Sequence, residues 1–227
     1  MNPNDLNNLS PVDEDLKQRM LQFTIDCNDG KGNAYACHSA AEFHAVIEKD
    51  HAKAAEVLKK NCDGKNNYGA SCYKLGRFFL LGKGVEANDE QAMKRFEKSC
   101  DNGISAGCYF LGMMLEEGKV AKDVGRARQM FSKACDNGDP ESCFMMGQKL
   151  LAEAVQGSPY KRDPPLAMQH LTTACRASHA PSCRLLAVMF KNGDEGVAPD
   201  AAKFEEYKQL TMDLVQQRGS MMGMKVT

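Results

Sequence analysis

The sequence predicts an all-α protein, an α/α superhelix (solenoid) of about five helical hairpins cross-linked by disulfides. Three observations predict this fold. A short phrase recurs about every 35 residues, the apolar residues inside each copy have helical spacing, and ten cysteines fall into five near pairs. The 227 residues are enough for one continuous repeat array.

Two phrases alternate along the chain. Cys72 and Cys108, in successive copies of the first phrase, are 36 residues apart, and Cys108 and Cys143 are 35 apart, which is the period of helix-turn-helix repeats. The copies of the first phrase are Gly69-Ala-Ser-Cys-Tyr-Lys-Leu-Gly76, Ala106-Gly-Cys-Tyr-Phe-Leu-Gly112 and Glu141-Ser-Cys-Phe-Met-Met-Gly147. Those of the second are Phe96-Glu-Lys-Ser-Cys-Asp-Asn-Gly103, Phe131-Ser-Lys-Ala-Cys-Asp-Asn-Gly138 and, more loosely, Leu171-Thr-Thr-Ala-Cys175.

Each copy predicts two helices. The segment Gly82-Lys-Gly-Val85 ends the first helix, and Asn88 or Asp89 is placed to cap the second. Asp123 and Asp200 are the expected caps in later copies. The apolar positions of the two helices are Cys72, Leu75, Phe79 and Leu80, followed by Ala92, Phe96 and Cys100.

Three glycines stand in the middle of predicted first helices, where glycine costs about 1 kcal/mol relative to alanine. Such a cost is tolerated when a neighbouring helix passes too close for a side chain. We therefore expect tight packing inside the hairpins at Gly76, Gly112 and Gly147.

The predicted organisation is a disordered N-terminus over 1–13, a single solenoid over 14–217 and a flexible tail over 218–227. Compared with the other copies of the repeat, the chain has extra residues between Glu153 and Pro165, and these predict an enlarged inter-helix loop. The last helix, Lys203 to Gln217, is expected to close the array with a charged outer face. The predicted units are an N-terminal cap over 14–34 and hairpins over 35–69, 70–105, 106–140, 141–181 and 182–217.

The cysteines form near pairs whose members are 10, 10, 8, 8 and 8 residues apart. One member ends a second helix and the other opens the next first helix, which favours a disulfide between consecutive hairpins. The rival pairing joins the helices of one hairpin, as Cys72 with Cys100, but leaves Cys27 and Cys183 unpaired. No two cysteines have the close spacing of a zinc knuckle, and no cysteine stands out as a catalytic thiol. The near pairs are Cys27/Cys37, Cys62/Cys72, Cys100/Cys108, Cys135/Cys143 and Cys175/Cys183.

The formal net charge of −1 gives no overall field to attract nucleic acid or an anionic membrane. No run approaches the roughly 20 apolar residues of a transmembrane helix. The polar start of the chain, Met1 to Ser10, has neither a secretory nor a transit pattern. We therefore expect an export signal to be absent or already removed, and we expect no transmembrane segment and no nucleic-acid partner.

These phrases resemble the Sel-one-like repeat (SLR), a relative of the tetratricopeptide repeat (TPR), in its cysteine-bearing form. The resemblance covers roughly residues 14–217. Two groups share this form, namely secreted bacterial proteins of the cysteine-rich Hcp beta-lactamase type and the mitochondrial cytochrome c oxidase assembly factor seven family. The first unit lacks the Gly-x-Gly-Val loop, and Ala54-Ala-Glu-Val-Leu-Lys59 precedes Cys62. With Ser71-Cys-Tyr-Lys-Leu-Gly76, these features look more like the mitochondrial group.

The resemblance implies a non-catalytic scaffold of the mitochondrial intermembrane space that assists assembly of cytochrome c oxidase (complex IV), with a link to haem. The expected partners are a respiratory-chain subunit or assembly factor, bound mainly by the first helices, and the intermembrane-space disulfide relay during import. One alternative is a secreted bacterial protein with ligand-binding or beta-lactamase-like activity. Another is a permanent subunit of a respiratory complex.

Few residues suggest chemistry. Ser71-Cys-Tyr-Lys74 matches Ser-x-x-Lys, but the partner motifs of a beta-lactamase are absent and hairpin packing explains it better. Gly82-Lys-Gly84 is too short for a phosphate loop. The methionines of 220–225 could attract Cu(I), although an apolar terminus is the simpler interpretation. We predict no catalytic residue and no metal site. Haem would need an axial ligand, for which the candidates are His38, His44, His51, His170 and His179.

Overall fold

The structure is a computed structural model in which residues 11–28, 33–153 and 160–221 are described. Within these ranges the regular elements are α-helices, apart from one isolated antiparallel bridge between Asp194 and Val197. This confirms the all-α prediction. The helices are α1 (Pro11–Asn28), α2 (Ala34–Val46), α3 (His51–Asp63), α4 (Gly69–Leu81), α5 (Asp89–Asp101), α6 (Ser105–Glu117), α7 (Val124–Asp136), α8 (Pro140–Leu151), α9 (Pro164–Arg176), α10 (Ala180–Asn192) and α11 (Ala201–Met221).

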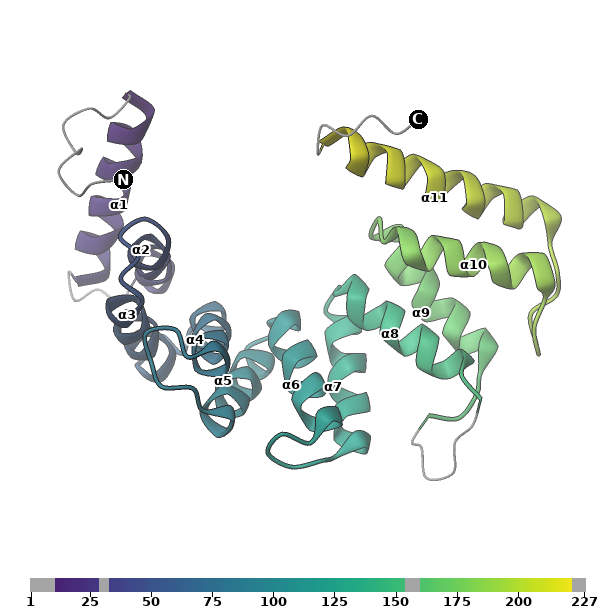
Figure 1. The fold of residues 1–227 in the computed structure, drawn as a ribbon, viewed down its shortest axis with the longest axis horizontal. Helices are drawn as coiled ribbons and strands as arrows, with labels where there is room; N and C mark the ends of the chain where they lie inside the picture. Colours follow the sequence, from purple (N-terminus) through teal and green to yellow (C-terminus); the bar gives the residue numbers. More distant parts are fainter. Residues whose placement is uncertain (1–10, 29–32, 154–159, 222–227) are drawn as a thin grey trace. The chain divides into compact units, whose positions relative to one another are not determined.

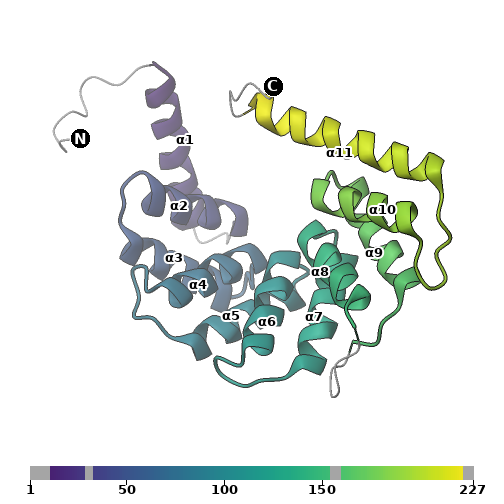
Figure 2. The ribbon, with the colours of Figure 1, turned by 45° about the vertical axis from the view of Figure 1, so that its right-hand side comes forward.

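The chain divides into two compact units, unit 1 (Met1–Gly107) and unit 2 (Cys108–Thr227), with the boundary inside α6. In unit 1, each helix from α1 to α4 packs against the next, and in unit 2 each helix from α7 to α10 does the same (Figure 1). Figure 2 shows α10 and α11 side by side at the end of unit 2. The hairpins are as predicted, whereas a single continuous solenoid over 14–217 stays a prediction.

The second helices begin at side-chain caps. The side chain of Asn88 accepts a hydrogen bond of 2.8 Å from the backbone N–H of Gln91. Asp123 and Asp200 accept equivalent bonds of 2.8 and 3.0 Å. Each bond satisfies one of the backbone donors that the first turn of a helix leaves unpaired. Asn88 rather than Asp89 is therefore the cap, and Asp89 lies in the first turn.

The apolar stripes of α4 and α5 form the core of their hairpin. Ala92, Phe96 and Cys100 are at most 1 % exposed, as the helical spacing predicts. In α4, however, Phe78 is buried while Leu80 is only partly buried. The difference arises because Phe78 lies one turn beyond Leu75 on the side that faces α3, where the preceding hairpin packs.

The mid-helix glycines of unit 2 lie against the facing second helix. A Cβ on Gly112 would be 2.8 Å from Cε1 of Phe131, and one on Gly147 would be 2.6 Å from Cγ of Leu171. Both facing side chains are fully buried. The close approach expected from the sequence is therefore present at both positions.

The terminal helices extend past their predicted limits. Helix α1 begins at Pro11, so residues 11–13 are helical, because proline is well suited to the first position of a helix. Helix α11 continues to Met221, beyond the predicted end at Gln217. Its outer surface is not only charged, since Phe204, Tyr207 and Leu214 form the stripe that packs on α10 and leave other apolar side chains outside it. Those exposed side chains are Leu210, Met212 and Val215.

The connection between α8 and α9 is the enlarged loop that the sequence predicts. Helix α8 ends at Leu151 and α9 begins at Pro164, after the N-cap Asp163. Residues 154–159 of this loop lie outside the described residues. The same holds for residues 1–10 and 222–227, and so for most of both predicted disordered ends.

Candidate functional site

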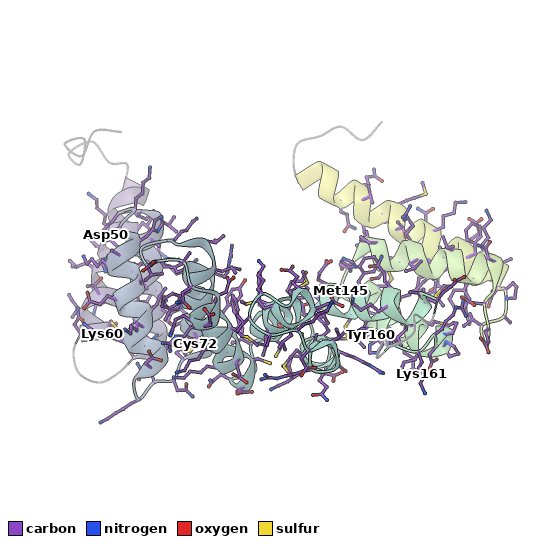
Figure 3. All side chains as sticks on the ribbon, turned by 60° about the horizontal axis from the view of Figure 1, so that its bottom comes forward. Asp50, Lys60, Cys72, Met145, Tyr160 and Lys161 are labelled. Atoms are coloured by element: carbon purple, nitrogen blue, oxygen red, sulfur yellow. A yellow bond between two sulfur atoms is a disulfide. The ribbon has the colours of Figure 1, made fainter. Side chains whose placement is uncertain are left out.

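The junctions between consecutive hairpins carry disulfides. The bonds are Cys27–Cys37, Cys62–Cys72, Cys135–Cys143 and Cys175–Cys183, and Cys100 and Cys108 are also disulfide-bonded. Their geometry follows from the fold, because one cysteine ends a second helix and its partner opens the next first helix. Cys72, labelled in Figure 3, is bonded to Cys62, so the rival bond to Cys100 is not formed.

Each unit presents an accessible surface on its first helices, which we call its first-helix face. It consists of the residues one, two and five places after the cysteine of each first helix, none of which is buried. In unit 1 these residues are His38, Ser39, Glu42, Tyr73, Lys74 and Arg77. In unit 2 they are Tyr109, Phe110, Met113, Phe144, Met145, Gln148, Arg184, Leu185 and Val188.

The first-helix face of unit 1 is polar and charged. Lys74 donates a 2.8 Å hydrogen bond to Glu42, which joins α4 to α2. That bond lowers the pKa of the Glu42 carboxyl, and burial opposes it. The guanidinium of Arg77 lies 6.0 Å from the ring centre of Tyr73. This face therefore offers a cation, an ion pair and an aromatic ring to a partner.

The first-helix face of unit 2 is mainly aromatic and aliphatic. The rings of Tyr109 and Phe110 lie 5.5 Å apart, and Phe144 packs on His179 with ring centres 4.9 Å apart. Val188 is 46 % exposed, although it stands in the middle of α10. Aromatic and methionine side chains at such positions give an adaptable apolar surface.

Ser71 belongs to a buried polar network and not to a nucleophilic site. Its side chain is fully buried, and its hydroxyl oxygen accepts a 2.8 Å hydrogen bond from Nδ2 of Asn61. Nδ1 of His38 lies 3.1 Å from the same oxygen, and burial lowers the pKa of His38. A serine closed off from solvent in this way is suited to join α2, α3 and α4. The packing interpretation of Ser71-x-x-Lys74 is the one that these contacts favour.

The five candidate haem ligands each have a neighbour in the fold. His38 contacts Ser71, and Nδ1 of His44 is 2.7 Å from Glu48. His51 meets Phe78 edge-on, and His179 lies 2.8 Å from the Ser182 hydroxyl. Among the described residues no hydrogen bond or ring contact joins two of these histidines. These contacts single out none of the five histidines as a haem ligand, so no haem-dependent step follows from them. The fifth, His170, lies beside a disulfide.

Two anchoring side chains were missed from the sequence. Arg95 of α5 is only 7 % exposed and pairs with Asp63 at the end of α3. Tyr160, which is labelled in Figure 3, is buried at the end of the enlarged loop, and Nζ of Lys149 lies 5.2 Å from its ring centre. Burial raises the pKa of Tyr160 to about 12. Alignment of the repeats could have found Arg95, because Val57 and Met130 occupy the equivalent positions.

Other kinds of site receive no support from the described ranges. In them no three His, Cys, Asp or Glu side chains gather as a set of metal ligands. No helix traced there is both long enough and apolar enough to cross a bilayer. Of the methionines of 220–225, which could attract Cu(I) but are more simply an apolar terminus, Met222 and Met224 lie outside the described residues.

Helical hairpins whose junctions carry disulfides define an α-helical repeat protein. The Sel1 repeat matches residues 69–104, 105–139, 140–179 and 180–203. Cytochrome c oxidase assembly factor 7 of Xenopus tropicalis is 34% identical over 215 residues, covering 92% of this chain and 91% of the relative. The human protein of the same name is 33% identical over 221 residues, covering 91% and 93%.

The chain therefore belongs to the Sel1 repeat family and, within it, to the family of cytochrome c oxidase assembly factor 7. Among solved structures, a Sel1 repeat protein from Oxalobacter formigenes matches with a TM-score of 0.73 at 18% identity, covering 88% of this chain and 83% of that one. The Escherichia coli antigen c5321 matches with a TM-score of 0.69 at 22% identity, covering 86% and 41%. At these identities the two structures show the fold alone, which is the solenoid of SLR hairpins that the sequence predicts.

Proposed function

We propose that the protein is a non-catalytic scaffold that assists assembly of cytochrome c oxidase by binding a respiratory-chain subunit or assembly factor. The observation that carries this proposal is the match to proteins named cytochrome c oxidase assembly factor 7 over more than nine tenths of the chain. The repeat architecture supports it, because stacked hairpins create the extended surfaces that repeat proteins use for binding.

The first-helix face is the proposed binding surface. Its residues in unit 1 are mostly polar, whereas those of unit 2 are mostly apolar. The face of unit 1 would therefore suit a charged partner stretch, and the face of unit 2 an apolar one. The second helices carry charged side chains such as Lys60 and Lys94 at exposed positions, which suits a surface in contact with water.

We also place the protein in the mitochondrial intermembrane space, where the disulfide relay would oxidise it during import. The support is chemical. All ten cysteines are disulfide-bonded, and such bonds persist in oxidising compartments. Fractionation of mitochondria, with alkylation of free thiols before lysis, tests this location. Ten alkylated cysteines in the native protein would overturn it.

Affinity purification from mitochondria tests the binding function with two pairs of variants. Arg77→Glu and Val188→Asp change exposed residues of the first-helix face. Lys94→Glu and Val120→Asp make the same kinds of change at exposed positions outside that face. We expect the first pair to reduce recovery of respiratory-chain proteins by about tenfold or more and the second pair to leave it unchanged.

Two outcomes would contradict the proposal. If the unmodified protein recovers no respiratory-chain component, the function is wrong. If both pairs of variants bind equally well, the first-helix face is not the surface. Recovery of the protein in fixed stoichiometry with the mature oxidase would instead identify a permanent subunit.

A further inference from the structure

One position of the second helices differs in chemistry from repeat to repeat. It is the seventh residue after each N-cap, and its occupants are Val57, Arg95, Met130, His170 and Tyr207. His170 uses this position to reach back to the preceding junction, where its Nδ1 lies 3.5 Å from Sγ of Cys135. An ionisable ring therefore touches one sulfur of the Cys135–Cys143 bridge.

The next bridge along unit 2 is a matched reference. Cys135–Cys143 and Cys175–Cys183 both close loops with a sequence separation of 8. Their burial is the same, with the first cysteine of each 4 % exposed and the second 0 % exposed. At the position equivalent to His170, Tyr207 stacks on Phe190 with ring centres 5.7 Å apart. Loop length and access therefore do not distinguish the two bridges, whereas the neighbouring ring does.

The two bridges also belong to different parts of the core. Cys135 and Cys143 form a small cluster with Ala174. Cys175 and Cys183 are part of the larger cluster that holds α9, α10 and α11 together. Opening the first bridge would therefore act first on the α7–α8 junction.

We propose that Cys135–Cys143 is a redox-sensitive modification site, a disulfide that dithiols open more readily than Cys175–Cys183 because His170 stabilises the reduced Cys135. A disulfide sulfur carries no proton to donate. After reduction, the Cys135 thiol can donate to an imidazole nitrogen, or its thiolate can accept from an N–H. Either bond lowers the free energy of the reduced form and makes the bridge easier to reduce.

The charge state of the ring suits this role. Burial lowers the pKa of His170, with Asp136 opposing the change and Arg128 adding to it. At neutral pH the imidazole is therefore uncharged, with one nitrogen able to accept a proton. It can take up the thiol proton of Cys135 or share it in a hydrogen bond.

The reaction is a two-step thiol–disulfide exchange. A thiolate of the dithiol attacks Sγ of Cys143, the bond between Cys143 and Cys135 breaks, and its electron pair leaves on Cys135 as a thiolate that takes up a proton. The second thiolate of the dithiol then attacks the other sulfur of the same dithiol, which is bonded to Cys143, and releases Cys143. The protein gains two electrons and two protons, and the dithiol becomes a cyclic disulfide.

Redox titration of the full-length protein tests the proposal. The oxidised protein is equilibrated with mixtures of reduced and oxidised dithiothreitol at pH 7, quenched with acid, alkylated and mapped by peptide mass spectrometry. We expect the equilibrium constant for reduction of Cys135–Cys143 to exceed that of Cys175–Cys183 by about tenfold, which is about 30 mV for this two-electron couple.

The variant His170→Met assigns the effect to the ring, because Met130 already fills the same position of α7. We expect the tenfold difference to disappear in this variant while the constant for Cys175–Cys183 stays unchanged. Equal constants for the two bridges in the unmodified protein would overturn the proposal without any variant. If the difference persists in His170→Met, His170 is not its cause and that part of the proposal is wrong. Far-UV circular dichroism checks that the variant is folded.

Discussion

Gly76 and Phe96 are in direct contact across the hairpin of α4 and α5. A Cβ on Gly76 would lie 2.8 Å from Cε1 and 2.9 Å from Cδ1 of the Phe96 ring, and Phe96 is fully buried. The ring therefore occupies the space that any other residue at position 76 would need. The same relationship recurs in both hairpins that follow, so the repeat depends on a glycine facing a large side chain.

Replacing Gly76 by alanine should destabilise the protein. Overpacking costs typically 1–3 kcal/mol, and the better helix propensity of alanine returns about 1 kcal/mol. We expect a net loss of up to about 2 kcal/mol in the free energy of unfolding, measured by urea titration with disulfides intact.

Gly125→Ala is the control for this substitution. Gly125 is in α7, and the nearest atom to its Cβ would be Oδ1 of Asp123 at 3.5 Å, an ordinary contact. This change should be neutral or stabilising by up to about 1 kcal/mol. Equal effects at both glycines would contradict the packing argument. A double variant with Phe96→Leu should recover part of the loss, since the two positions are coupled.

Reduction of the bridges should lower stability in increments. A loop of eight to ten residues corresponds to about 2–3 kcal/mol in the chain-entropy picture. Replacing Cys175 and Cys183 together by alanine should therefore lower the free energy of unfolding by that amount. Urea titration under non-reducing conditions measures it, and an unchanged midpoint would show that packing alone holds the junction.

Mild acidification should lower the stability of the protein, because the buried His38 is harder to protonate in the folded state. Burial lowers the pKa of His38 below its usual value of 6.5, so the unfolded state takes up its proton first. The contribution of neutral His38 to the free energy of unfolding is fully present above the unfolded pKa. It is lost as the pH falls from about 6.5 through the lower pKa of the folded state. The groups around the ring are Ser71, Tyr68, Glu42 and Lys74.

The variant His38→Gln isolates this contribution. Between pH 7 and pH 5 its melting temperature should fall less than that of the unmodified protein. Parallel curves for the two proteins would show that His38 does not carry the dependence.

The cap of α7 should be measurable by substitution. Asp123→Ala removes the acceptor of the Arg126 N–H and should cost about 1 kcal/mol. Asp123→Asn keeps an oxygen in the same place and should cost little. Thermal unfolding compares the two, and an equal loss in both would point to the charge and not to the hydrogen bond.

The sequence by itself determined the hairpins and their junctions. Helix type, caps, cysteine spacing and the mid-helix glycines are all local signals, and they repeat about every 35 residues, so each copy strengthens the interpretation of the others. The same signals identified Asp123 and Asp200 as caps, narrowed the cap of α5 to Asn88 or Asp89, and placed the loop after α8. Local signals are less exact at the ends of the array, where α1 and α11 extend past their predicted limits because no neighbouring copy fixes the frame.

Only the tertiary structure decided which side chains meet across repeats. His170 contacts Cys135 and Arg95 pairs with Asp63, and each pair is separated by more than 30 residues. Burial of the Tyr160 ring likewise depends on tertiary packing, in which Lys149 of α8 lies over the ring. Such contacts follow from the spacing of stacked helices, because it is the packing of one hairpin on the next that brings these side chains together. A period in the sequence gives that stacking order, but not the direction in which each side chain points.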